Sequence, residues 1–168
     1  MAVNLSPRQF KSQTLAHTVV SALSDAGLTA SRLELEITES VLLTDNDTAL
    51  ATLHHIRSLG VRIAMDDFGT GYSSLSYLRL FPFDKIKIDQ SFIRELGSSK
   101  DCAAIVKAVV DLGASLGITT TAEGVETSDQ LNRVREQGCG EIQGYLFGKP
   151  VPLSSVYELI KQQLRRTA

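Results

Sequence analysis

The stretch "IAMDDFGTGYSS", residues 63–74, indicates both the fold and the position of a site. Three residues of an apolar strand, at positions 63–65, lead into two adjacent carboxylates, Asp66 and Asp67, and then into a loop with glycine at positions 69 and 71. Carboxylates this close repel each other, which disfavours their charged forms. The sequence therefore predicts a positively charged partner at the point where a buried strand ends.

Segments rich in Val, Ile and Leu alternate with helical segments on both sides of this stretch. Alternation with helices of ten or more residues indicates βαβ crossovers and a parallel sheet. We expect strands over 2–5, 32–37, 62–65, 84–88, 118–122 and 141–143. Capping signals and terminal glycines predict helices over 6–27, 47–59, 100–116 and 128–137, a last helix from Ser155, and shorter ones near 74–80 and 90–96.

Composition excludes several classes of protein. The chain has 168 residues, 43% of them hydrophobic, which is typical of one globular domain. A net charge of −2 gives no basic face for a nucleic-acid polymer. The apolar runs are too short for direct membrane insertion, and the chain has no signal peptide, so we expect a cytoplasmic protein. Cys102 and Cys139 lack the spacing of a metal site and are expected to be reduced thiols.

Side chains alternate between the two faces of a strand, so each expected strand can be divided by parity. One parity is apolar and suits contact with helices: Val3, Leu5, Leu33, Leu35, Ile37, Ile63, Met65, Ile86, Ile88 and Ile142. The other parity is polar toward the carboxyl ends: Asn4, Glu34, Glu36, Arg62, Ala64, Asp66, Lys85, Lys87, Asp89, Thr119, Thr121, Glu123, Glu141 and Gln143. A polar face exposed to water would explain Glu34 and Lys85. Parallel sheets are usually covered on both faces, however, so a barrel with a polar mouth fits better.

The candidate ligands at that mouth are all oxygen donors: Asn4, Glu36, Asp66, Asp67 and Glu123, with Glu126 one turn beyond. Because neither Cys nor His joins them, the set favours Mg²⁺ or Mn²⁺ over zinc. Neighbouring carboxylates of this kind can bridge two ions about 3.5–4 Å apart, as in two-metal phosphoryl chemistry. Lys87 ends the next strand on the inward parity. It could stabilise a developing phosphate charge or only neutralise excess carboxylate.

Six segments carry a family resemblance that covers nearly the whole chain: "VNLS", "LELEITES", "MDDFGTGYSSLSYL", "KIKID", "AEGVET" and "QGYLFGKP". In this order and spacing they resemble the EAL-domain family of cyclic-di-GMP phosphodiesterases. The resemblance implies an α/β fold, a modified (β/α)8 TIM-like barrel. It also implies hydrolysis of one phosphodiester bond of cyclic-di-GMP (c-di-GMP) to linear pGpG, with two Mg²⁺ or Mn²⁺ ions and an attacking water.

The resemblance also assigns roles to residues of this chain. Asn4, Glu36, Asp66, Asp67 and Glu123 fall on metal-ligand positions. The catalytic positions are Lys87, which assists the water, together with Glu123 and Asp67. Gln143, Glu126 and Asp89 line or support the site. Glu39 matches a glutamate that anchors the loop over 68–75, which couples the metal site to dimer contacts in the family.

The sequence departs from the family in one respect. The Glu-Ala-Leu signature and the basic residue after it are absent, and residue 1 falls at what resembles the third strand. We therefore expect one EAL domain over 1–168, N-terminally truncated, with about six βα units and impaired hydrolysis of c-di-GMP. The open strand edges predict a homodimer or other self-association.

Two other functions remain as alternatives. The chain could be a catalytically inactive EAL-like module that binds nucleotide or a protein partner. It could also be a phosphoreceiver, because those domains use an acidic pair and a lysine at strand ends. A receiver has its acidic pair after its first strand, whereas two βα units precede Asp66 here, and Glu36 and Glu123 add ligands that a receiver does not need. We rank that alternative last.

Overall fold

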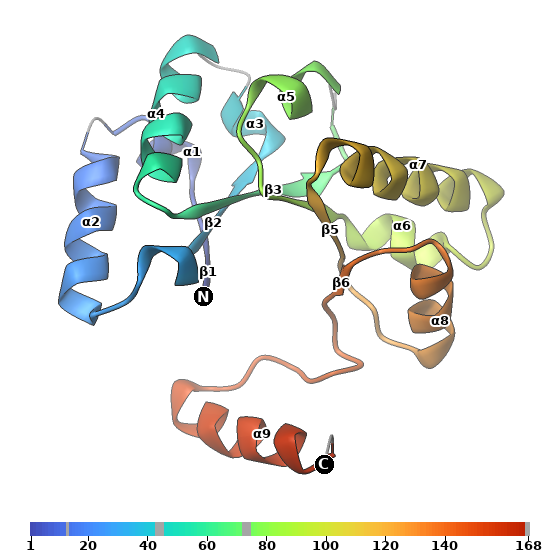
Figure 1. Ribbon diagram of the computed structural model, residues 1–168. Helices are drawn as coiled ribbons and strands as arrows, with labels where there is room; N and C mark the ends of the chain where they lie inside the picture. The colour runs from blue at the N-terminus through green and yellow to red at the C-terminus, as the bar shows by residue number, and fades with distance from the viewer. Residues whose placement is uncertain (13, 43–45, 72–74, 167–168) are drawn as a thin grey trace.

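The computed structural model describes residues 1–12, 14–42, 46–71 and 75–166. One parallel sheet follows the order of the chain, so each strand pairs with the next. Figure 1 shows the sheet curving, with helices along its outer side, into an incomplete barrel. The predicted α/β fold with about six βα units is confirmed. Its strands are β1 Ala2–Asn4, β2 Glu34–Thr38, β3 Arg62–Phe68, β4 Lys85–Ile88, β5 Thr119–Ala122 and β6 Glu141–Ile142.

Helices connect the strands and extend beyond β6. They are α1 Pro7–Phe10, α2 Leu15–Ala26, η1 Ala30–Arg32, α3 Glu39–Leu42, α4 Asn46–Ser58, α5 Leu75–Leu80, α6 Gln90–Glu95, α7 Lys100–Leu116, α8 Ser128–Glu136 and α9 Leu153–Arg166. In Figure 1, α9 (red) lies apart from the helices that follow the outer side of the sheet. Among the described residues, no helix combines the length and apolar character needed to cross a membrane.

The predicted helix over 6–27 is wrong, because the chain forms two helices there. The capping box of Ser6 and Gln9 starts α1 as expected, and Gly27, with φ of 59°, ends α2. Between them the Thr14 amide donates to the Ser12 hydroxyl, a local bond that competes with helix formation. The break lets both Phe10 and Leu15 reach the core, whereas five positions apart on one helix they would face different sides.

Three smaller differences also separate the structure from the predicted elements. Strand β3 continues to Phe68 instead of ending at Met65, and it therefore includes both aspartates. Helix α3, which follows β2 directly, was not predicted. The last helix begins at Leu153, two residues before Ser155, and the amide of Ser155 donates to the carbonyl of Pro152 within its first turn.

The division by parity is confirmed in the central strands. Ile37, Ile63 and Ile86 are fully buried beneath the helices, and Met65 and Ile88 are 1% exposed. On the edge strand β1, however, Val3 is 41% exposed although it has the apolar parity, because β1 has a neighbouring strand on one side only. The polar parity of β2, β3 and β4 faces the inside of the curve, where Glu34, Glu36, Asp66 and Lys87 are buried as well, whereas Arg62 is exposed. The charged side chains of that face therefore need partners inside the protein.

Candidate functional site

A bulge at the end of β3 turns two consecutive aspartates toward one site. Met65 pairs with Ile86 and Phe68 with Ile88, so β3 has one more residue than β4 over this interval. Asp67 has φ of 53°, a left-handed conformation that Asp tolerates better than most side chains. Bulges commonly redirect side chains beside functional sites. Here the bulge overrides the strand alternation that would send Asp66 and Asp67 to opposite faces.

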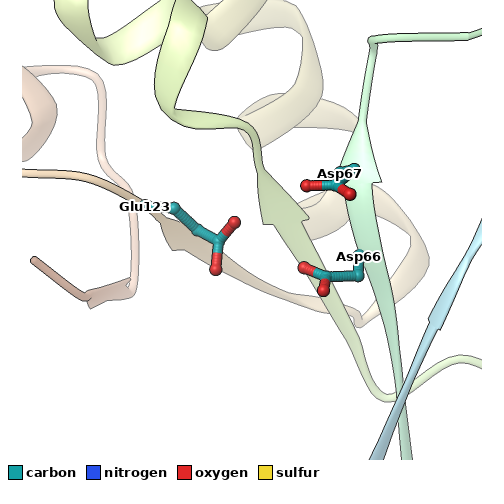
Figure 2. A group of neighbouring side chains, drawn as sticks. All are labelled: Asp66, Asp67 and Glu123. Carbon is teal, nitrogen blue, oxygen red and sulfur yellow. The ribbon is translucent and has the colours of Figure 1, made fainter. Parts of the chain in front are cut away.

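Asp66, Asp67 and Glu123 form a carboxylate cluster. One oxygen from each lies within 4.8 Å of the others, and Figure 2 shows the two aspartates on β3 facing Glu123, which follows β5. Spacing of this order lets three carboxylates share a cation, and hard oxygen donors suit Mg²⁺, Mn²⁺ or Ca²⁺. The residues present therefore fit a divalent metal centre of the kind predicted from the sequence.

Lys87 lies among the carboxylates. Its Nζ donates to Asp66 Oδ1 at 2.8 Å and lies 2.8 Å from Glu123 Oε1 and 3.0 Å from Glu36 Oε1. Its side chain is only 5% exposed, and these partners come from three other segments of the sheet. Lys87 thus gives Asp66 a positive partner inside the protein, whereas the partners predicted for the two adjacent aspartates were divalent cations. The Lys87 ammonium also holds Glu36 beside the cluster, because it contacts one carboxylate oxygen each of Glu36, Asp66 and Glu123.

The pKa values of the site reflect this crowding. Burial alone would lower the pKa of Lys87, but hydrogen bonds to Asp66, Glu123 and Glu36 outweigh it and raise that pKa above its usual range. Burial raises the pKa of Glu123. Burial and repulsion by Asp66 and Asp89 raise the pKa of Asp67. The charged ammonium form of Lys87 is therefore favoured. A further positive charge would stabilise the ionised forms of the carboxylates.

Two other predicted residues, Asn4 and Asp89, lie on elements next to this cluster. Asn4 ends the edge strand β1 and pairs in register with Glu36, while the described contacts of the cluster come from β2 to β5. Asp89 caps α6, where its Oδ1 accepts from the amide of Ser91 at 2.9 Å. Asp89 therefore stabilises the start of α6, next to Lys87 on β4.

Glu39 lies against the loop after β3. The side chain of Glu39 is buried, and a Cβ atom on Gly71 would lie 2.7 Å from Glu39 Oε2. That contact suits the predicted loop anchor. Residues 72–74 of the loop over 68–75 lie outside the described residues.

A pocket of about 280 Å³ opens beside Glu123. Two residues predicted to support the site, Gln143 and Glu126, line it. Sequence reasoning missed the others, which are Gln90 and Arg94 on α6, Gly124, Gly144 and Tyr145. The spacing of Gln90 and Arg94, one helical turn apart directly after a strand with an inward lysine, was the available signal.

A second lysine forms a separate ion-pair layer at the amino ends of the strands. Lys85 Nζ lies 2.9 Å from Glu34 Oε1 and 2.8 Å from Glu141 Oε2, and Arg62 Nε lies 4.0 Å from Glu34 Oε2. Hydrogen bonds to Glu141 and Glu34 outweigh burial and raise the pKa of Lys85, and the bond to Lys85 lowers the pKa of Glu141. This layer joins β2, β4 and β6 across the inside of the sheet.

Several known proteins are similar to this chain over most of its length. NbdA, a cyclic di-GMP phosphodiesterase of Pseudomonas aeruginosa, is 42% identical over 161 residues, which cover 96% of this chain and 21% of NbdA. The PaMucR phosphodiesterase in complex with c-di-GMP has a TM-score of 0.87 and 46% identity, over 92% of this chain and 63% of that chain. A manganese and c-di-GMP complex of Klebsiella pneumoniae BlrP1 has a TM-score of 0.83 and 37% identity. The match covers 89% of this chain and 38% of the BlrP1 chain.

This chain spans about a fifth of the length of the curated relatives that it matches. The family model described as EAL domain matches the sequence over residues 1–150. This range includes the carboxylate cluster, Lys87 and the pocket. The family resemblance carried by the six sequence segments is thereby confirmed: this chain belongs to the EAL domain family.

Proposed function

We propose that this chain forms the greater part of a phosphodiesterase domain that hydrolyses c-di-GMP to linear pGpG. The observation that carries the proposal is the cluster of Asp66, Asp67 and Glu123 around Lys87 at the carboxyl ends of the strands. Ligands of α/β proteins bind at that end of the sheet. The phosphodiesterase and c-di-GMP named for similar structures agree with this chemistry.

Two Mg²⁺ or Mn²⁺ ions are the proposed cofactors. Asp66, Asp67 and Glu123 would hold them, with Glu36 and Asn4 on the neighbouring strands. Bound divalent ions supply polarisation of a water and neutralisation of phosphate charge. Phosphoryl-transfer enzymes depend mainly on such positioning and charge stabilisation.

The surroundings of Lys87 limit what it can do. Without metal, the hydrogen bonds of Lys87 to Asp66, Glu123 and Glu36 raise its pKa, which favours the protonated ammonium over a proton-accepting base. It can donate to a nonbridging phosphate oxygen or to the oxygen of a water while Asp66 and Glu123 hold it in place. We therefore propose that Lys87 stabilises charge in the reaction and that Glu123 and Asp67 position the cations.

We further propose that residues 1–168 alone turn over c-di-GMP slowly. These residues contain no Glu-Ala-Leu segment, whose glutamate the family uses as a metal ligand and whose following basic residue faces a substrate phosphate. Loss of support even outside the direct ligands typically costs about 10- to 100-fold in metal affinity or activity. A chain that binds c-di-GMP without hydrolysing it would instead be a binding module, which is the alternative function.

The test compares this chain with a chimera in which the PaMucR segment that precedes the matched region is joined to residue 1. Formation of pGpG in excess Mn²⁺ is measured for both. We expect the chimera to be at least tenfold faster and to lose activity on Glu123→Gln or Lys87→Met, while exposed Lys107→Met leaves it unchanged. Equal rates for the two chains would show that the missing glutamate is not needed. No turnover by either would refute the phosphodiesterase proposal.

A further inference from the structure

The loop that follows β3 lies between two helices that belong to the neighbouring strands. In the sheet, β3 lies between β2 and β4, and these two strands are followed by α3 and α6. On the side of α3, a Cβ atom on Gly71 would lie 2.7 Å from Glu39 Oε2. On the side of α6, a Cβ atom on Gly69 would lie 2.7 Å from Cε2 and 3.0 Å from Cζ of Phe92. The edge of the Phe92 ring therefore lies directly against the backbone of the loop.

Phe92 is held in place at the start of α6. Asp89 caps this helix, and the amide of Phe92 donates to the carbonyl of Asp89 at 3.2 Å. The next residue, Ile93, is fully buried in the core. The Phe92 side chain is itself half-buried and packs against the core. The ring therefore gives the loop a fixed surface to rest on.

The backbone of Asp67 needs such support. Its φ of 53° is a left-handed conformation, which is unfavourable for a residue with a Cβ atom and persists only where surrounding contacts hold it. Inside the loop, the amide and the hydroxyl of Thr70 donate to the Asp67 carbonyl at 3.3 and 2.9 Å. From outside the loop, the Phe92 ring contacts Gly69, two residues after Asp67. Because a regular strand would turn Asp67 away from the other two carboxylates, contacts that hold the loop also hold the cluster together.

We infer that Phe92 is a positioning residue of the metal centre. Its ring fixes Gly69 and thereby the left-handed backbone of Asp67, so that the Asp67 carboxylate stays within reach of a cation shared with the rest of the cluster. Phe92 acts through the backbone of the loop and is the counterpart, on α6, of Glu39 on α3. This inference rests on the proposed function and adds a residue that sequence reasoning did not place at the site.

The test measures Mn²⁺ binding to the 168-residue chain by calorimetry, together with the melting temperature without metal. Phe92→Ala should weaken Mn²⁺ binding about 10- to 100-fold, the usual effect of removing a group that orients a metal ligand. Leu112→Ala is the matched control, because Leu112 is also half-buried but lies near the end of α7, next to Gly113, at the amino end of β5. Both variants should melt below wild type, and only Phe92→Ala should bind Mn²⁺ more weakly.

A second variant shows whether Phe92 acts through Asp67. Asp67→Asn should itself weaken Mn²⁺ binding. Adding Phe92→Ala to it should then cost less than a further twofold, because the carboxylate that Phe92 positions is already gone. If Phe92→Ala does not fold, Phe92→Leu takes its place in each comparison, with a smaller expected loss because the leucine keeps part of the contact with Gly69.

The outcomes separate this inference from the proposed function. Independent, multiplying losses in the double variant would show that Phe92 affects the metal by another route, which overturns the inference. A Phe92→Ala chain that binds Mn²⁺ as wild type does, or a Leu112→Ala chain that loses as much affinity, would also overturn it. The proposed metal centre would stand in each of these cases. If the wild-type chain bound no Mn²⁺, the metal centre of the proposed function would fail, and the role of Phe92 with it.

Discussion

Replacing Lys87 by Met tests whether one ammonium group holds the carboxylate cluster together. The variant leaves Glu36, Asp66 and Glu123 buried without their shared cation; their side chains are only 10%, 12% and 16% exposed. Removing one partner from a buried ion pair typically costs about 3–5 kcal/mol. For a domain of this size, each kcal/mol shifts the melting temperature by about 2–4 °C, so we expect a fall of roughly 6–20 °C without metal.

Divalent cations should reverse much of that loss. With Lys87 removed, Mn²⁺ meets three uncompensated carboxylates, whereas in the wild-type chain it competes with the ammonium for Asp66 and Glu123. Saturating Mn²⁺ should therefore raise the melting temperature more in Lys87→Met than in wild type, measured by calorimetry or circular dichroism. If the metal-free variant is too unstable to fold, as stabilities of about 5–15 kcal/mol allow, folding upon Mn²⁺ addition is the readout.

Lys85→Met is the matched control for this experiment. Lys85 lies on the same strand and also bridges two carboxylates, Glu34 and Glu141, but it is outside the cluster. Its loss should destabilise the chain without any gain from Mn²⁺ beyond that of wild type. Equal Mn²⁺ shifts in all three proteins, or a metal-free Lys87→Met chain as stable as wild type, would refute the reasoning.

Three further predictions concern metal binding, pH and assembly. Asp66→Asn should abolish Mn²⁺ binding in calorimetry, and unchanged affinity would refute the metal assignment. The bond to Lys85 lowers the pKa of Glu141, so Glu141 adds stability above its ordinary pKa of 4.5 that is lost as the pH falls through the lower folded value. Glu141→Gln should flatten this acid dependence in melting curves; an unaltered pH profile would contradict it. The strands β1 and β6 end the described sheet, so light scattering should show self-association, and a cooperatively unfolding monomer at micromolar concentration would imply internal closure.

The sequence predicts those features that depend on local chemistry. Gly27 and Gly117 end their helices, and Thr127 with Gln130 forms a capping box, because a cap involves only residues a few positions apart. Strand parity is equally local, so the buried face and the inward polar face were both predictable. The break between Phe10 and Leu15 was not, since capping signals mark the ends of a helical segment without showing an interruption inside it.

The arrangement of the site depends on contacts between strands. Parity alone would place Asp66 and Asp67 on opposite faces, and only the register shift between β3 and β4 brings them together. The contact of Lys87 with carboxylates from three other segments likewise requires the curvature of the sheet. The pocket depends on Gly124 meeting Gln90 across a turn, a contact that no spacing in the sequence specifies.

Charge balance favours the proposed metal centre at the level of Lys87 and not at the level of Lys85. In the ion-pair layer of Lys85, Lys85 and Arg62 face Glu34 and Glu141, so two positive charges oppose two negative ones. In the layer of Lys87, one lysine faces four carboxylates, which leaves a formal charge of −3. These carboxylates are Glu36, Asp66, Asp67 and Glu123. Two divalent cations would change −3 to +1, and one phosphodiester carries −1. The charge of the carboxylates around Lys87 therefore matches two metal ions and a single bound phosphodiester. The layer around Lys85 is already neutral, and its ion pairs join the strands.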